Sequence, residues 1–585
     1  MFRILIAALL VGSFSLGGCT KKGRESENTL NVVVSSNIKG LDPVNISDTY
    51  SSLVASQMYE GLLHYNYLQR PLKLQPLLAA EMPKVSSDGL THTFKIRPGM
   101  KFHDDQAFPE SKGREVTAED FIYSWKRLAD PANQSEAFWV FDGKIVGLNE
   151  WRDKMGKKEA DYSTPVAGLT APDKNTLVIK LTKPYYQLHY VLAMSTTVVV
   201  PKEAVEKYGK EFLNHPVGTG PFKFESWTRN SQIVMVKNPN WATHTYPTEG
   251  TEEDKASGAL ADAGQKLPFV DKLVVHEIIE DQPRWLNFMK GNLDFVAIPK
   301  DNFDGAVQSN QMTEEMQKKG ILLSITREPD VTYTAFNMLD PVVGKNENLR
   351  KAISLATDTD TLIQKFYNGR AVSAHSPIPP DVDGYDANYK NPYKEYNISK
   401  AKELLSKAGF PEGKGAPEIE YSTTSSSTAR QMAEYFKQNM EAIGLKVKID
   451  STSWPQFTTK IREKKAQVWG IAWMADYPDA ENFLQLLYGQ NVSPGPNGSN
   501  YKSKEFDALY EKASKLPPGN ERTKIYQQMR DIAARDLPWI PNAHRLGYIT
   551  YHSWLKNFKY HSIINDYLKY LRVDTKARGE QKANL

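Results

Sequence analysis

Apolar runs alternate with amphipathic stretches along most of the chain, and the alternation is most regular after residue 419. The spacing of apolar positions switches repeatedly between the period of a strand and that of a helix. It predicts strands at 419–421, 445–449 and 467–475 and helices at 428–443 and 457–464. A strand–helix–strand–helix–strand order predicts a parallel, doubly wound α/β sheet.

The segment 467–487, QVWGIAWMADYPDAENFLQLL, combines a strand, a turn and a helix. Its bulky β-formers predict a strand buried on both faces, and the Asp-Tyr-Pro-Asp run at 476–479 predicts a turn. Ligand sites of open α/β sheets lie at the carboxyl ends of strands, so Asp476, flanked by Trp473 and Tyr477, is a candidate site for a cation. On local pattern alone, an Asp before a turn that contains Pro is most often a helix cap or turn former, and this interpretation is the favoured one for Asp476.

Elsewhere the pattern predicts further regular elements. Strands are expected at 29–35, 176–181, 198–201, 273–279, 294–298 and 568–573, with a β meander in 74–105. Thr117-x-x-Asp120 is a capping box that opens an amphipathic helix ending before Asp130-Pro131, and further helices are expected at 285–289, 508–516 and 520–536. The segment 242–264 is small, polar and acidic, and predicts a disordered surface insertion.

Composition limits the class of protein. A chain of 585 residues is too long for one ordinary core, so two or three domains are expected. With 24% charged and 40% hydrophobic residues it is typical of a soluble globular protein. A net charge of +4 without a basic stripe argues against nucleic-acid binding.

The first 28 residues predict export and a lipid anchor. A positive start at Arg3 precedes the apolar run 4–16, which is too short to span a bilayer comfortably. Leu16-Gly17-Gly18-Cys19 resembles a bacterial lipoprotein processing site, and Cys19 is the only cysteine of the chain. We therefore expect a signal peptide at 1–18, lipidation at Cys19 and a polar tether over 19–28. A plain signal peptide with an incidental cysteine is the alternative.

No motif of the sequence indicates an enzyme active site. Ser399-x-x-Lys402 matches S-x-x-K, but Ser399 lies where it would cap a helix, and His276-Glu277 lacks the second histidine of a zinc helix. Gly218-Thr219-Gly220 suggests a close backbone approach but lacks the remaining features of a phosphate loop. We expect no catalytic residue, no metal and no cofactor.

Several segments resemble the periplasmic oligopeptide-binding proteins, the solute receptors of ABC importers (family 5 of the bacterial extracellular solute-binding proteins). Trp473, Ala475, Asp476 and Tyr477 resemble that family's W-x-A-D-Y segment, and 116–131, VTAEDFIYSWKRLADP, resembles a family scaffold motif. The G-L-D-P at 40–43, Y-E-G-L at 59–62 and G-T-G-P-F at 218–222 are similar to further family elements. The resemblance covers nearly all of 29–575, and 242–264 is its main departure.

The resemblance implies a two-lobed α/β fold of the Venus-flytrap type. Lobe one is expected at 29–335, with an extra domain at 64–197 and the insertion at 242–264. Lobe two is expected at 336–539, followed by a return to lobe one at 540–575 and a tail at 576–585. Two chain crossings near Tyr333 and Pro538 are expected to act as a hinge.

The resemblance also implies a site and partners. Asp476 would receive the α-ammonium group of a peptide, and Trp473 would line the cleft. Arg462 is the nearest candidate for the carboxylate end, although its place on a solvated helix favours an ordinary surface residue. The remaining expected peptide-binding residues are Thr49, Tyr50, Ser51, Thr219, Gly220, Tyr333, Ala472, Met474 and Tyr477. An ordinary helix start is the alternative interpretation of 48–52.

The implied protein is a monomeric, lipid-anchored receptor that delivers peptide to an ABC permease in the inner membrane. A surface sensor or interaction lipoprotein of the same fold would use the same binding residues. A peptidase is the third class considered.

Overall fold

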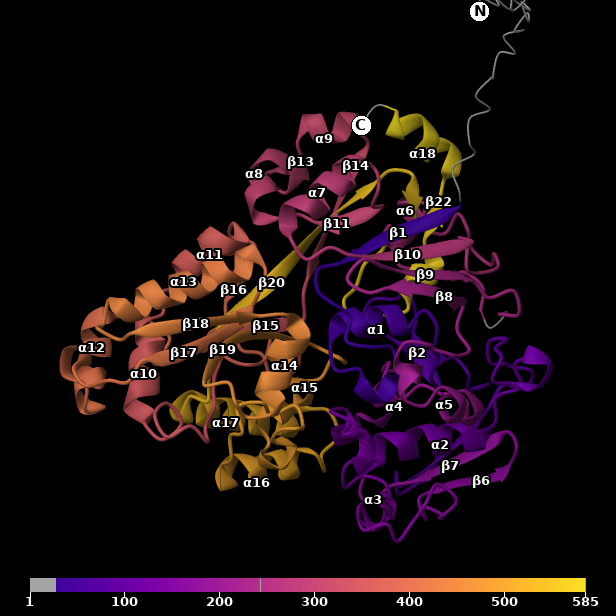
Figure 1. The fold of residues 1–585 in the computed structure, drawn as a ribbon, viewed down its shortest axis with the longest axis horizontal. Helices are drawn as coiled ribbons and strands as arrows, with labels where there is room; N and C mark the ends of the chain where they lie inside the picture. The colour runs from indigo at the N-terminus through magenta and orange to yellow at the C-terminus, as the bar shows by residue number, and fades with distance from the viewer. Residues whose placement is uncertain (1–27, 242–243, 584) are drawn as a thin grey trace, which may run out of the picture.

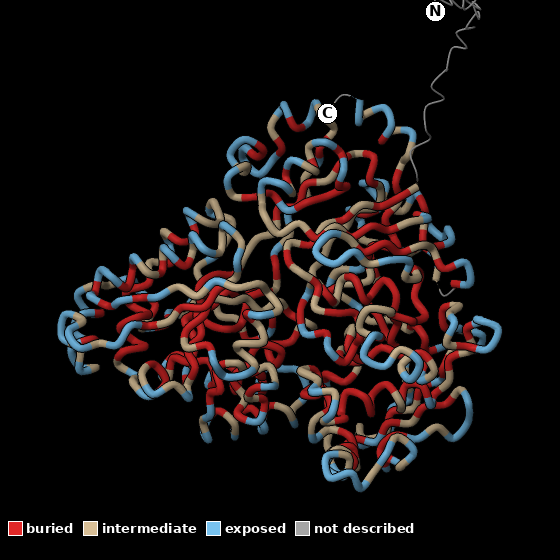
Figure 2. Tube along the Cα trace, in the orientation of Figure 1, coloured by how far each residue is buried: buried red, intermediate tan, exposed pale blue. Residues whose placement is uncertain are grey.

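The computed structural model describes residues 28–241, 244–583 and 585, and it contains two lobes side by side (Figure 1). The expected signal peptide, Cys19 and nearly all of the tether lie outside the described residues. Buried segments concentrate in the sheets of both lobes and in the helices against them (Figure 2). No helix of the described chain has both the length and the apolar character needed to cross a membrane.

Lobe one is built on a four-stranded sheet of order β1–β10–β9–β8, in which β1 and β10 are parallel and the other pairs antiparallel. The strands are β1 Thr29–Val34, β10 Lys272–Glu277, β9 Gln232–Lys237 and β8 Phe222–Thr228. The predicted strands at 29–35 and 273–279 are therefore confirmed. Helices α1 Thr49–Ala55, α4 Leu188–Val191 and α5 Lys202–Tyr208 also belong to this lobe.

The extra domain is a second four-stranded sheet, of order β4–β5–β7–β6, with α2 packed against it and α3 packed on α2. Its elements are β4 Lys84–Val85, β5 Thr91–Lys95, α2 Ala118–Ala129, α3 Leu148–Gly156, β6 Leu169–Asp173 and β7 Thr176–Lys180. The predicted capping box at Thr117 and Asp120 opens α2. The strand predicted at 198–201 is wrong, because this buried stretch joins no sheet and only Val199 N donates to a distant backbone oxygen, that of Glu60 (3.1 Å).

A third part of lobe one has its own apolar cluster. It contains α7 Asp281–Met289, β11 Phe295–Ala297, α8 Phe303–Ala306, α9 Glu314–Lys318 and β14 Ile321–Arg327. The expected tail is ordered as helix α18, Thr575–Lys582, whose buried Arg578 donates to Asp294 (2.7 Å) and to the backbone of Thr29 (2.7 Å).

Lobe two contains a sheet with the inner order β15–β19–β17–β18. The strands are β15 Asp330–Phe336, β19 Val468–Met474, β17 Ile419–Thr424 and β18 Val447–Thr452. Helices of this lobe are α10 Glu347–Ala356, α11 Thr359–Tyr367, α12 Ile398–Lys407, α13 Ser427–Glu441, α14 Trp454–Arg462, α15 Glu481–Leu484, α16 Lys504–Ala513 and α17 Asn520–Asp536. The expectation of a parallel sheet holds for β17 with β18 and β19, but β15 runs antiparallel to β19.

A two-stranded ribbon joins the lobes. β14 and β15 follow each other along one side of the long strand β20, Trp539–His552. The first half of β20 pairs with β15 and with β16, Ala371–Ser373, and its second half pairs with β14 and β11. Residues 328–329, between β14 and β15, are therefore the crossing. The boundaries expected at 335 and 539, and the hinge expected near Tyr333 and Pro538, instead fall in or directly beside the sheet of lobe two. Tyr333 stacks there on Trp539 at 3.8 Å, and Phe336 N donates to Pro538 O at 3.1 Å.

The insertion is ordered where it is described, so the expectation of disorder is wrong for 244–264. It contains α6, Glu252–Ala256, opened by a capping box of Thr251 and Asp254, and its ends meet through a bridge between Thr245 and Lys266. Buried Asp254 and Asp262 pair with Lys559 and Arg572. The closing strand is shorter than predicted: β22, Arg572–Val573, pairs with β21, Leu555–Lys556.

Candidate functional site

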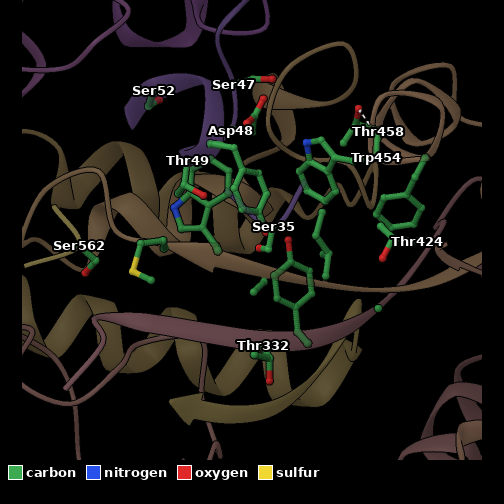
Figure 3. A pocket seen from close by; sticks show the side chains of 18 of the residues that line it. Ser35, Ser47, Asp48, Thr49, Ser52, Thr332, Thr424, Trp454, Thr458 and Ser562 are labelled. Atoms are coloured by element: carbon green, nitrogen blue, oxygen red, sulfur yellow. Dashed lines mark hydrogen bonds between the residues drawn. The ribbon is translucent and has the colours of Figure 1, made fainter. Parts of the chain in front are cut away.

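A cavity of about 660 Å³ lies between the two lobes. Lobe one contributes the start of α1 and Trp139, lobe two contributes β15, α14 and β19, and residues 560–565 of the returning chain complete the wall. Figure 3 shows Thr49 and Ser562 on one side of the pocket and Trp454 and Thr424 on the other. Its volume lies within the range of sites that enclose a small organic ligand.

Aromatic rings from both lobes line this cavity. The lining rings include Tyr50, Trp139, Tyr333, Tyr421, Trp454, Trp469, Trp473 and Trp539. Tyr50 of lobe one meets Trp454 of lobe two edge to face, with ring centroids 6.0 Å apart. Rings offer large apolar contact surfaces at little cost in conformational entropy, so they suit the wall of a cavity that binds a partly apolar ligand.

Asp476 is half-buried and opens into the cavity at the end of β19. Its carboxylate accepts a hydrogen bond from Asn482 Nδ2 (2.9 Å), and burial raises its pKa from 3.8 to about 6. Asn482 Oδ1 in turn accepts from the Asp476 backbone (2.9 Å) and from Trp473 Nε1 (3.0 Å). Within the described part of the chain, no basic side chain pairs with Asp476. The site therefore presents a positioned carboxylate whose charge is not balanced by the protein.

The strand that leads to Asp476 has an open edge. All seven residues of β19 pair with β15, whereas β17 reaches only Val468 and Trp469 on the other side. From Gly470 to Met474 no described strand occupies that second side, and these residues line the cavity. Unpaired backbone groups at such an edge can hydrogen-bond an extended chain. The strand predicted to be buried on both faces is thus half-exposed here because the cavity opens against it.

The structure brings eight of the twelve expected peptide-binding residues to the cavity: Thr49, Tyr50, Tyr333, Arg462, Ala472, Trp473, Met474 and Asp476. Four lie elsewhere. Ser51 is buried and bonds to Asp48, the N-cap of α1, and the hydroxyl of Tyr477 donates to buried Glu481 (2.6 Å). Thr219 and Gly220 form a buried turn against Gln57 and Met58, where a Cβ on Gly220 would come within 2.7 Å of Gln57 O. The glycine permits close packing of backbone on backbone there.

Arg462 lines the cavity and takes part in a contact between the lobes. Its Nη1 lies 3.5 Å from Glu136 Oε1, and Lys39 Nζ lies 3.9 Å from the same oxygen.

Three residues of the site were not predicted from the sequence: Glu136, Trp454 and Asn482. The local pattern around Trp454 indicates only a helix start, and nothing in the sequence connects Asn482 with Asp476. No group of three His, Cys, Asp or Glu side chains suited to a metal occurs within the described ranges.

Comparison with known proteins identifies the family. Residues 73–495 match the model described as bacterial extracellular solute-binding proteins, family 5 Middle. The chain belongs to this family. Among similar proteins, the Helicobacter pylori periplasmic binding protein DppA, solved with the peptide STSA, is 25% identical, with a TM-score of 0.76 over 94% of this chain and 98% of that one. The two-lobed α/β fold expected from the sequence is confirmed.

Curated relatives of this family 5 protein differ in their named ligands. The glutathione-binding protein GsiB of Escherichia coli O1:K1 / APEC is 27% identical over 543 residues, covering 92% of each chain. Heme-binding protein A of Haemophilus influenzae is 26% identical over 540 residues, covering 90% of this chain and 89% of that protein. These relatives are named for binding, not for catalysis, and their ligands are chemically diverse.

Proposed function

We propose that this family 5 protein is a peptide receptor of an ABC importer, held at the membrane by a lipid on Cys19. The observation that carries the proposal is the half-buried carboxylate of Asp476, which pairs with no basic side chain of the described residues and stands at the end of the open edge of β19. A peptide offers the matching chemistry, because it joins a cationic α-ammonium group to a chain of backbone donors and acceptors.

In the proposed complex the α-ammonium group pairs with Asp476, and the peptide backbone pairs with Gly470–Met474 as an added strand. Asn482 holds the carboxylate and the Trp473 ring in place before the ligand arrives, which lowers the entropic cost of binding. Main-chain pairing carries no preference for side chains, so we expect broad selectivity. The lobes would close by bending of the ribbon near residues 328–329.

Two lines of similarity support peptide as the ligand class and import as the role. The family is one of extracellular solute-binding proteins, and the DppA neighbour was solved with a peptide. The Leu16-Gly17-Gly18-Cys19 segment supports the lipid anchor.

Native mass spectrometry of the purified protein tests the proposal. We expect peptides to co-purify with the protein and to dissociate from it on denaturation. We also expect a peptide that is incubated with the protein to be recovered intact. A screen of synthetic dipeptides to octapeptides then defines the preferred length. Consistent absence of peptide binding across that screen would overturn the proposal, and peptide fragments after incubation would indicate a peptidase.

A further inference from the structure

The wall of the cavity at residues 560–565 has no regular secondary structure to hold it. Between β21, which ends at Lys556, and Tyr567, the chain forms only turns and irregular backbone. Yet all six residues of this segment line the cavity. Figure 3 shows one of them, Ser562. Its shape depends on a local turn, in which Ile564 N donates to His561 O (3.1 Å), and on contacts with other parts of the chain, such as the bond from Gln57 Nε2 to Asn565 O (2.8 Å).

The 244–264 insertion makes such a contact immediately before the wall. Both carboxylate oxygens of Asp254 accept from Lys559 Nζ, at 2.6 and 2.7 Å, and the same nitrogen donates to the backbone of Leu68 at 2.8 Å. Only 5% of the Asp254 side chain is exposed. Because Lys559 directly precedes the lining residue Tyr560, this ion pair lies at the start of the wall.

A second carboxylate of the insertion holds the chain on both sides of the wall. Asp262 Oδ2 accepts from Asn557 Nδ2 at 2.8 Å and from Arg572 Nε at 2.7 Å. Asn557 lies before the wall and Arg572 lies after it, in β22. One buried acid thus joins the two ends of the segment that contains the wall.

Aromatic packing adds to these polar contacts. Tyr246 of the insertion is fully buried and packs against Tyr67 and Tyr570, with ring centroids 6.3 and 6.2 Å away. Tyr67 stacks on Tyr570 at 4.3 Å, and its hydroxyl accepts from Lys559 N at 2.9 Å and donates to Asn557 O. The insertion therefore contacts the returning chain through two ion pairs and one buried ring.

We propose that the 244–264 insertion is a brace that holds the cavity wall at 560–565 and thereby limits which ligand side chains the cavity accepts. Asp254 and Asp262 are its positioning residues. The role of the insertion in side-chain selectivity rests on the proposed peptide function, whereas its role in holding the wall does not.

Substitutions at Asp254 separate the brace from the local helix. Asp254→Asn removes the negative charge that pairs with the ammonium group of Lys559. Thr251→Ala is the matched control, because Thr251 and Asp254 form the capping box of α6. This change weakens the cap but keeps the ion pair between the Asp254 carboxylate and Lys559. Asp254→Glu keeps the charge and remains compatible with a capping box, so it is the rescue variant.

Hydrogen exchange on the peptide-free protein tests the wall directly. We expect Asp254→Asn to increase exchange in 557–565 by about tenfold or more while the sheets of lobe two stay unchanged. Thr251→Ala and Asp254→Glu should leave 557–565 near its wild-type rate. The brace would be overturned if Asp254→Asn and Thr251→Ala increased exchange in 557–565 equally. It would also be overturned if neither Asp254→Asn nor Lys559→Met increased that exchange. Lys559→Met gives a second route should Asp254→Asn fold poorly.

A competition experiment tests selectivity. An equimolar mixture of peptides that differ at one side chain is offered to each variant, and the bound fractions are measured by native mass spectrometry. We expect the ratio between the best and the poorest binder to shrink severalfold in Asp254→Asn and to be restored in Asp254→Glu. Unchanged ratios despite a loosened wall would overturn the selectivity role. If the wild-type protein bound no peptide, the proposed function would fail, and exchange would still decide the brace.

Discussion

Asp476 and Asp479 belong to one turn, three residues apart, and their surroundings are opposite. Asp479 is 5% exposed and accepts hydrogen bonds from Arg522 (2.8 Å), Tyr526 (3.2 Å) and Gln187 (3.2 Å). Asp476 opens into the cavity, and the amide of Asn482 is its only side-chain partner among the described residues.

The difference shows how one turn can serve both the fold and the ligand. Asp479 also accepts from the backbone of Glu481 (3.0 Å), at the start of α15, so the cap-like role considered for Asp476 belongs to Asp479. The charge of Asp479 is balanced by a buried arginine. Asp476 keeps a carboxylate that burial disfavours, and a cationic ligand would relieve that cost.

Protein stability should respond in opposite directions to the same substitution at the two sites. Asp479→Asn leaves the buried guanidinium of Arg522 without its counter-ion, so we expect a loss of about 3–5 kcal/mol in the free energy of unfolding. Asp476→Asn removes a disfavoured charge, and we expect a gain of about 1–2 kcal/mol at pH 7 in the ligand-free protein, allowing for partial solvation. Denaturant unfolding measures both.

The gain from Asp476→Asn should depend on pH. Because the folded-state pKa of Asp476 is raised from 3.8 to about 6, the wild-type carboxyl favours the fold below about pH 4 and loses that contribution as the pH rises through 6. The two proteins should therefore be similar in stability at pH 4 and differ at pH 7. Destabilisation of the empty protein by Asp476→Asn at pH 7 would contradict this contrast.

Peptide affinity should fall in acid with the same midpoint. Below about pH 6 the free receptor binds a proton at Asp476, and a neutral carboxyl cannot pair with an ammonium group, so we expect about a tenfold loss of affinity per pH unit. Glu481 and Tyr65 are the titratable neighbours that interact with Asp476, and burial raises the pKa of both. Calorimetry at pH 7.5 and 5 measures the loss, which should be absent in Asp476→Asn.

Most of the regular elements could be predicted from local pattern. The helix predicted at 520–536 coincides with α17, and the capping box at Thr117 opens α2 as expected. The failures have physical reasons. The acidic composition of 242–264 suggested disorder, but Asp254 and Asp262 are paired with Lys559 and Arg572, about 300 residues away in the sequence.

The candidate site was predictable where it follows a strand. Asp476, Trp473 and Met474 reach the cavity because β19 places them there. Asn482 and Glu136 were not predictable, since their roles depend on a turn geometry and on contact between lobes. The glycines at 218 and 220 indicated close backbone approach correctly, but the neighbour is the chain itself.

The central claim is that Asp476 binds the α-ammonium group of a peptide, and a ligand–protein cycle tests it most directly. The strongest binder from the length screen and its N-acetylated form are titrated against wild type, Asp476→Asn and Asp304→Asn, an exposed control for the same change. We expect acetylation to weaken wild type and the control by about a hundred- to a thousandfold, and to change Asp476→Asn by less than about threefold. An equal loss on acetylation in wild type and Asp476→Asn would contradict the account.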